Sequence, residues 1–77
     1  MTPSQFDLDH IFTYHPPTPS DVQKYATLRD AAKAFAQVVV DNVPDGPDKS
    51  DAIRKIREAI MTANAAIALG GRIHRVP

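Results

Sequence analysis

Apolar side chains recur along two long segments of the chain with the spacing of a helix face. One stripe comprises Tyr25, Leu28, Ala32, Phe35 and Val39, and the other comprises Ile53, Ile56, Ile60, Ala63 and Ile67. Within each stripe the steps alternate between three and four residues, which places the side chains on one side of an α-helix. The pattern therefore predicts two amphipathic helices.

The first helix has clear boundary signals. Thr18 can cap it, Pro19 suits the first helical position, and Asp21 lies where a capping-box side chain bonds back to the cap. Pro44 cannot continue a helix. We therefore predict a helix over about residues 19–43.

A short turn separates the two helices. Asp45-Gly46-Pro47 is typical of a tight connection, and we expect Asp48 or Ser50 to cap the second helix. Gly70-Gly71 stops that helix, which we predict over about residues 49–69. A short loop makes the two helices antiparallel neighbours, so residues 19–69 form a hairpin.

The flanking segments are expected to lack regular structure. Residues 1–18 form an extended N-terminal arm, because Pro16 and Pro17 forbid a helix and hold His15 extended. Residues 70–77 form a short basic tail. The predicted fold is all-α, an antiparallel two-helix hairpin with an extended arm.

A chain of 77 residues is short for an independent fold. Such a domain buries only about 60% of its unfolded surface, and small chains usually add disulfides, a metal or a partner subunit. The chain has no cysteine, and its three histidines lack the spacing of metal ligands. We expect no metal and no cofactor. Assembly into a homo-oligomeric helical bundle would cover the outer apolar positions of the hairpin.

Charge is balanced overall but divided along the chain. Residues 1–48 carry seven acids and three bases, whereas residues 49–77 carry six bases and two acids. Opposed halves favour pairing within or between chains. With zero net charge, the chain has no overall electrostatic attraction to nucleic acid, and we expect no nucleic-acid partner. No apolar run suits a membrane span and the N-terminus lacks a signal-peptide pattern, so we expect a cytoplasmic protein.

No catalytic set is visible. An enzyme needs a nucleophile, a positioned base and a charge stabiliser, yet the chain has one glutamate, no cysteine and no glycine-rich phosphate loop. Gly70-Gly71 follows a helix, which is the wrong end for phosphate capture. The sequence therefore indicates binding without catalysis.

The arm carries the first candidate binding residues. Phe12, Tyr14 and His15 are planar side chains within four residues, and Pro16 stiffens the segment behind them. Aromatic planes on an extended segment suit stacking on a nucleobase. Alternatively, Phe12 and Tyr14 pin the arm to the hairpin.

Further candidates lie on the helices and the tail. Arg29 and Lys33, one helical turn apart, either clamp phosphates or belong to a solvated face. Thr62 and Asn64 are polar residues in an alanine-rich helix, and Asn64 either bonds a base edge or a neighbouring backbone. Arg72 would close over a ligand from a neighbouring subunit.

Three segments carry a resemblance to a known family. They are the motif FTYHPP over residues 12–17, the first helix with Tyr25 and Arg29, and the segment AIMTANAAIA over residues 59–68. Together they resemble the small phage helical-hairpin family shared by anti-CBASS and Thoeris anti-defence proteins. The resemblance covers about residues 11–69.

The resemblance implies a sponge function. Members of that family sequester cyclic dinucleotides, cyclic trinucleotides or cyclic ADP-ribose isomers without cleaving them, and they assemble as hexamers with pockets between subunits. In the dinucleotide binders an arm tyrosine stacks on a base and a cation of the first helix contacts phosphate. Tyr14 and Arg29 match that spacing, although lysine is usual where Arg29 stands. The alternative is a structural or protein-interaction hairpin with no small-molecule ligand.

Overall fold

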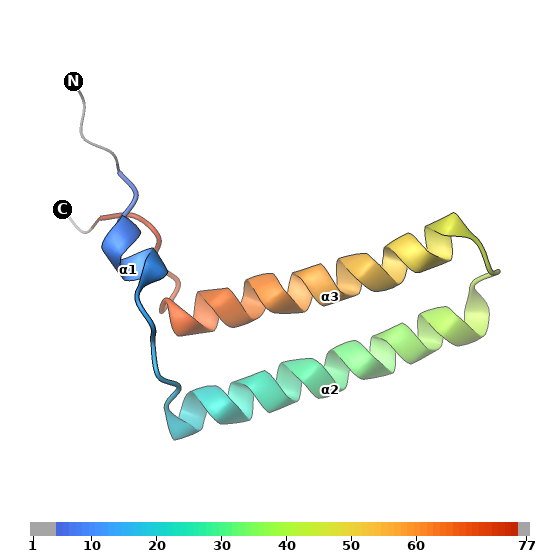
Figure 1. Cartoon of the computed structure of the whole chain (residues 1–77). Coiled ribbons are helices and arrows are strands. Elements are labelled where there is room, and N and C mark those ends of the chain that lie inside the picture. Colours follow the sequence, from blue (N-terminus) through green and yellow to red (C-terminus); the bar gives the residue numbers. More distant parts are fainter. Residues whose placement is uncertain (1–4, 76–77) are drawn as a thin grey trace.

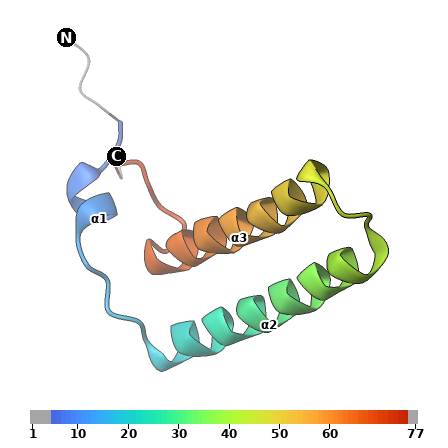
Figure 2. The same ribbon diagram turned by 45° about the vertical axis from the view of Figure 1, so that its right-hand side comes forward.

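A computed structural model describes residues 5–75, and that range contains three helices: α1 (Leu8–Phe12), α2 (Pro19–Asn42) and α3 (Pro47–Ala68). α2 and α3 run antiparallel and lie side by side, and α1 stands beyond the open end of the hairpin (Figures 1 and 2). The all-α class and the hairpin predicted from sequence are confirmed.

α2 begins and ends where its local signals place it. Thr18 Oγ1 accepts a bond of 3.1 Å from the Asp21 N–H, and the Asp21 carboxylate accepts one of 3.0 Å from the Thr18 N–H. These two bonds complete a capping box. The helix ends at Asn42, within one residue of the expected end.

α3 begins two residues earlier than expected. Gly46 occupies the N-cap position with no side-chain bond, so the expectation that Asp48 or Ser50 caps this helix is wrong. The reason is Pro47, whose fixed φ suits the first helical position and whose missing N–H is not needed there. At the other end, Gly70 and Gly71 have φ of 64° and 76°. Both lie in the left-handed region that ends helices.

The expectation of a fully extended arm is wrong for Leu8–Phe12, which form α1. The Asp7 side chain caps this short helix by accepting from the His10 N–H at 3.1 Å. Leu8, Ile11 and Phe12 follow the spacing of one helix face, which the prolines further along do not disturb. From Thr13 to Thr18 the chain is non-helical, as expected. Residues 1–4 of the arm and 76–77 of the tail lie outside the described residues.

The two long helices pack along one line of contact and do not enclose a buried core. None of the described residues is fully buried. The surface of 6250 Å² exceeds the roughly 4,600 Å² expected for a compact monomer of this mass. The radius of gyration is 16.5 Å, against about 11.5 Å for a compact chain of this length.

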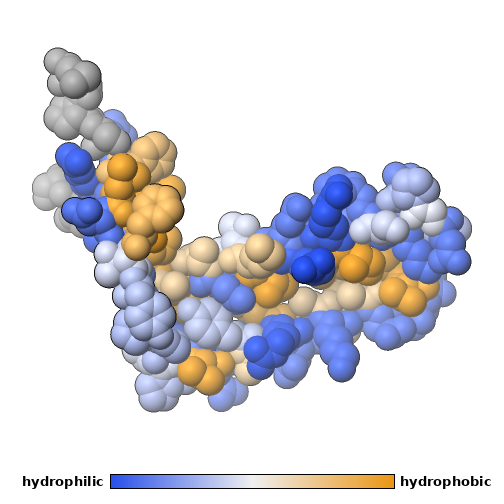
Figure 3. Space-filling model, in the orientation of Figure 1, coloured by the Kyte–Doolittle hydropathy of each residue, from blue (hydrophilic) through white to orange (hydrophobic). Residues whose placement is uncertain are grey.

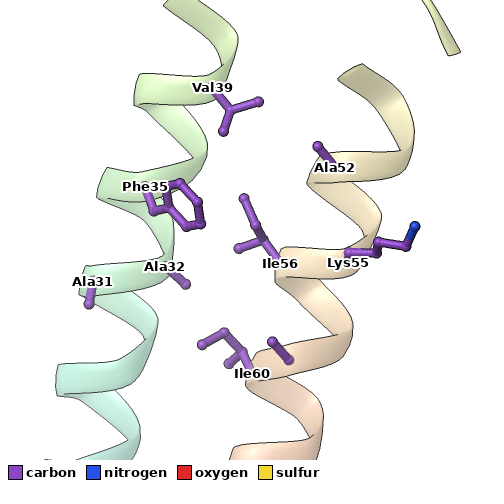
Figure 4. Close-up of a pocket in the computed structure, with 9 residues that line it drawn as sticks. Ala31, Ala32, Phe35, Val39, Ala52, Lys55, Ile56 and Ile60 are labelled. Carbon is purple, nitrogen blue, oxygen red and sulfur yellow. The ribbon is translucent and has the colours of Figure 1, made fainter. Parts of the chain in front are cut away.

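An apolar groove of about 690 Å³ runs between α2 and α3. Phe35 of α2 and Ile56 and Ile60 of α3 point into it from opposite sides (Figure 4). Phe35 nevertheless remains 59% exposed. Hydrophobic side chains gather along this groove and on α1 (Figure 3). No helix in the described part of the chain has both the length and the apolar character that a bilayer crossing requires.

Candidate functional site

The arm presents two aromatic rings to solvent. Phe12, the last residue of α1, is 82% exposed, and Tyr14, in the non-helical segment that follows, is 80% exposed. Rings this exposed do not pin the arm to the hairpin, which favours stacking over the alternative. Pro16 lies two residues further along and is also exposed.

Histidine side chains attach the arm to the end of α3. The His10 Nε2–H donates to the Leu69 carbonyl at 2.9 Å, and the His15 Nε2–H donates to the His10 carbonyl at 2.7 Å. The two rings meet edge to face with centroids 4.7 Å apart. His15, predicted to face a base, therefore uses one ring nitrogen within its own chain.

The tail binds the arm as well. Arg72 Nη1 donates to the Asp7 carboxylate at 2.8 Å, and the Asp7 N–H donates to the Ile73 carbonyl at 2.9 Å. The Arg72 guanidinium lowers the pKa of the Asp7 carboxyl, and the His10 backbone N–H lowers it further. The Phe6 and His74 rings stack at 5.0 Å. The expected closing residue Arg72 thus pairs with its own arm in the ligand-free chain.

The candidate phosphate-binding cations lie on the exposed surface of α2. Neither the Arg29 nor the Lys33 side chain forms an ion pair or a hydrogen bond with any other residue between 5 and 75. Arg29 lies about 15 Å along the helix axis from Pro19, and the arm leaves that end of α2 toward the end of α3 (Figure 1). The structure therefore does not bring Tyr14 and Arg29 of one chain together.

Thr62 and Asn64 differ in their surroundings. Thr62 is exposed, whereas Asn64 is half-buried and its Oδ1 is a buried atom with no hydrogen-bond partner among the described residues. Buried amide oxygens are nearly always bonded, so this atom is an exception that a water or a rotation of the Asn64 side chain would satisfy.

The residues that anchor the arm are not among those predicted from the sequence. Asp7 and His10 give no local signal of this role, because their partners Arg72 and Leu69 follow 65 and 59 positions later. One local signal was present, namely an aspartate followed by apolar residues at helical spacing. It would have found α1 but not the contacts with the tail.

A family model described as Acb2/Tad1, hairpin domain, matches residues 7–68, most of the chain. This chain belongs to the Acb2/Tad1 hairpin family. The resemblance to the anti-CBASS and anti-Thoeris sponge proteins is thereby confirmed, and the Acb2/Tad1 hairpin is an anti-defence domain rather than a catalytic one. The matched range includes α1, the exposed arm and both long helices, and it ends before Arg72. Searches of curated proteins and of solved structures gave no match.

Proposed function

We propose that this chain is a phage anti-defence sponge that binds and sequesters a cyclic nucleotide immune signal without cleaving it. The observation that carries the proposal is the Acb2/Tad1 family match, which spans the arm and both long helices. The exposed rings of the arm supply stacking surfaces for a base. The exposed cations of α2 supply counter-charge for phosphate.

Each candidate residue has a role in this proposal. Tyr14 and Phe12 stack on a base, His15 bonds its edge, and Pro16 holds the segment rigid. Arg29 and Lys33 hold phosphate. Thr62 and Asn64 bond a further base edge, and the Asn64 oxygen, which is buried and unpaired among the described residues, would reach it by rotation of the side chain. Arg72 closes over the ligand after leaving Asp7.

The pocket is proposed to lie between subunits of a homo-oligomer, a hexamer by family resemblance. No hydrogen bond or ring contact among the described residues joins Tyr14 to Arg29 of the same chain, and the arm leaves α2 toward the end of α3 (Figure 1), so the arm of one copy is proposed to meet the α2 of another. The apolar groove and the absence of any fully buried residue between positions 5 and 75 support assembly. The host cytoplasm is the proposed place of action.

Calorimetry against a panel of cyclic dinucleotides, cyclic trinucleotides and cyclic ADP-ribose isomers tests the proposal. We expect heat with at least one member. After denaturation of the complex, chromatography should recover that ligand intact. No heat with any member of the panel would refute the sponge function, and a cleaved ligand would refute sequestration.

Tyr14→Ala and Tyr14→Phe form a matched pair for the stacking role. A base–aromatic stack contributes about 1–3 kcal/mol, so the alanine variant should bind about tenfold more weakly or worse. The phenylalanine variant keeps the ring and should retain most of the affinity. Equal affinities for the two variants would exclude stacking by Tyr14.

The alternative is a protein-interaction hairpin without a small-molecule ligand, and the exposed apolar groove is the observation that favours it. That function predicts that Tyr14→Ala and Arg29→Ala leave anti-defence activity intact in infected cells, whereas Phe35→Asp abolishes it. The sponge function predicts that the first two changes also reduce activity, in proportion to the affinity that they lose.

A further inference from the structure

The arm and the tail form a connected set of contacts that the proposed binding roles do not use. We call Asp7, His10, His15, Leu69 and Arg72 the arm–tail clasp. Leu69 and Arg72 follow α3, and the other three belong to the arm. Figure 2 shows the tail running beside α1, which stands clear of the hairpin.

The histidine bonds of the clasp run in series. The Leu69 carbonyl accepts from the His10 ring, and the His10 carbonyl accepts from the His15 ring. Both bonds require a proton on Nε2. Leu69 lies just past the last turn of α3, and its carbonyl also accepts from the Arg72 N–H at 3.3 Å, so this one oxygen joins the arm and the tail at the end of the helix.

These bonds bracket Tyr14. Thr13 on one side donates its hydroxyl to the Asp9 carbonyl, and His15 on the other side bonds to His10. Tyr14 itself is 80% exposed. Its backbone is thus held by its two neighbours, while its ring stays available.

We propose that His10 and His15 are positioning residues, which fix the arm on the end of α3 so that Tyr14 is ordered before a ligand arrives. The inference rests on the proposed ligand-binding function of the arm. A segment ordered in advance loses less conformational entropy on binding, and the affinity rises accordingly. His15 contributes to this positioning through its Nε2 bond to the His10 carbonyl, which is separate from the base contact proposed for its ring above.

The test compares His10→Gln with His10→Asn. The glutamine amide nitrogen lies where Nε2 lies in histidine and can donate to the Leu69 carbonyl, whereas the asparagine side chain is one methylene shorter. The first readout is the ¹⁵N–¹H nuclear Overhauser effect of the Thr13 and Tyr14 amides in the ligand-free protein. The second is the Kd for the panel member that the wild type binds most tightly.

We expect His10→Asn to increase the mobility of both amides and to weaken binding about tenfold, as expected from the cost of ordering one backbone residue. His10→Gln should restore both values toward wild type. Circular dichroism and light scattering should show an unchanged hairpin. A second pair, His15→Gln and His15→Asn, tests the other bond if His10→Asn disturbs folding.

Unchanged amide mobility in the asparagine variants would overturn the proposal, and so would raised mobility with an unchanged Kd. Failure of glutamine to rescue would show that the ring itself, not its N–H, is needed, and would also overturn it. If the wild type binds no member of the panel, the proposed function fails, and the mobility comparison alone decides whether the clasp orders the arm.

Discussion

Two features of Asn64 destabilise the helix that contains it. Its Oδ1 is buried and unpaired in the isolated chain, which costs about 1–3 kcal/mol relative to a bonded oxygen. Asparagine is also a weaker helix former than alanine, and this position lies inside α3. A residue that destabilises its own helix is expected at a binding site, where the ligand supplies the missing donor.

Asn64→Ala should therefore raise the free energy of unfolding by about 1 kcal/mol while it weakens binding of the cyclic nucleotide. Urea unfolding at a fixed chain concentration measures the first effect, and calorimetry measures the second. Thr62→Ala is the control for helix propensity, because it also introduces alanine into α3 but the Thr62 side chain is exposed. A loss of stability in Asn64→Ala would mean that another subunit, not the ligand, satisfies Oδ1.

Asp7 gives the arm–tail clasp a defined dependence on pH. The bond from Arg72 lowers the pKa of this carboxyl below its ordinary value of 3.8. Because the folded state favours the ionised form of Asp7, the Asp7–Arg72 ion pair stabilises the clasp fully above pH 3.8. This stabilisation is lost as the pH falls through the lowered pKa. We expect nuclear magnetic resonance signals of Arg72 and the tail to shift toward those of an unattached tail only in that acidic range.

Asp7→Asn is the matched variant for this prediction. Asparagine caps helices as well as aspartate does, so α1 should persist, but the ion pair with Arg72 is lost. The tail signals of this variant should be independent of pH in the acidic range and resemble those of the wild type in acid. A tail that titrates identically in both proteins would contradict the assignment to Asp7.

At the scale of elements, the parts that were predictable are those with local causes. The apolar periods and the proline and glycine boundaries of α2 and α3 lie within a few residues of the structure they produce. The arm is different, because α1 is held by Arg72 and Leu69 from the far end of the chain. The exposure of Tyr14 depends on where the arm lies, so spacing along the sequence could propose this ring as a binding residue but could not place it.

The start of α2 allows a direct test of one such local cause. Thr18→Ala removes the oxygen that accepts from the Asp21 N–H, and loss of an N-cap side chain typically costs about 1 kcal/mol. We expect a lower thermal midpoint by circular dichroism. Thr18→Ser keeps the hydroxyl and should remain close to wild type. Equal midpoints for the serine and alanine variants would show that the capping box does not stabilise this helix.

At the scale of the whole molecule, the chain exposes large apolar side chains that a folded protein normally buries. Its dimensions of 51 × 36 × 17 Å describe a thin body, one helix layer deep. Apolar residues of the groove remain accessible, and large side chains outside the groove, such as Met61 and Val38, are 65% and 56% exposed. Surface of this kind is stable in water only when other copies or other proteins cover it.

Light scattering of the purified wild type should therefore give a mass well above 8.4 kDa. Phe35→Asp places a charge among the apolar side chains of the groove between α2 and α3, where the lining cation Lys55 already pairs with Asp51. It should dissociate the assembly and reduce the helix content together. Ser20→Asp adds the same charge to an exposed position in the first turn of α2, outside the groove, and should leave the mass unchanged. A wild-type monomer that unfolds cooperatively would refute assembly. Because the proposed pocket takes Tyr14 and Arg29 from different copies, such a monomer would also lack the proposed site.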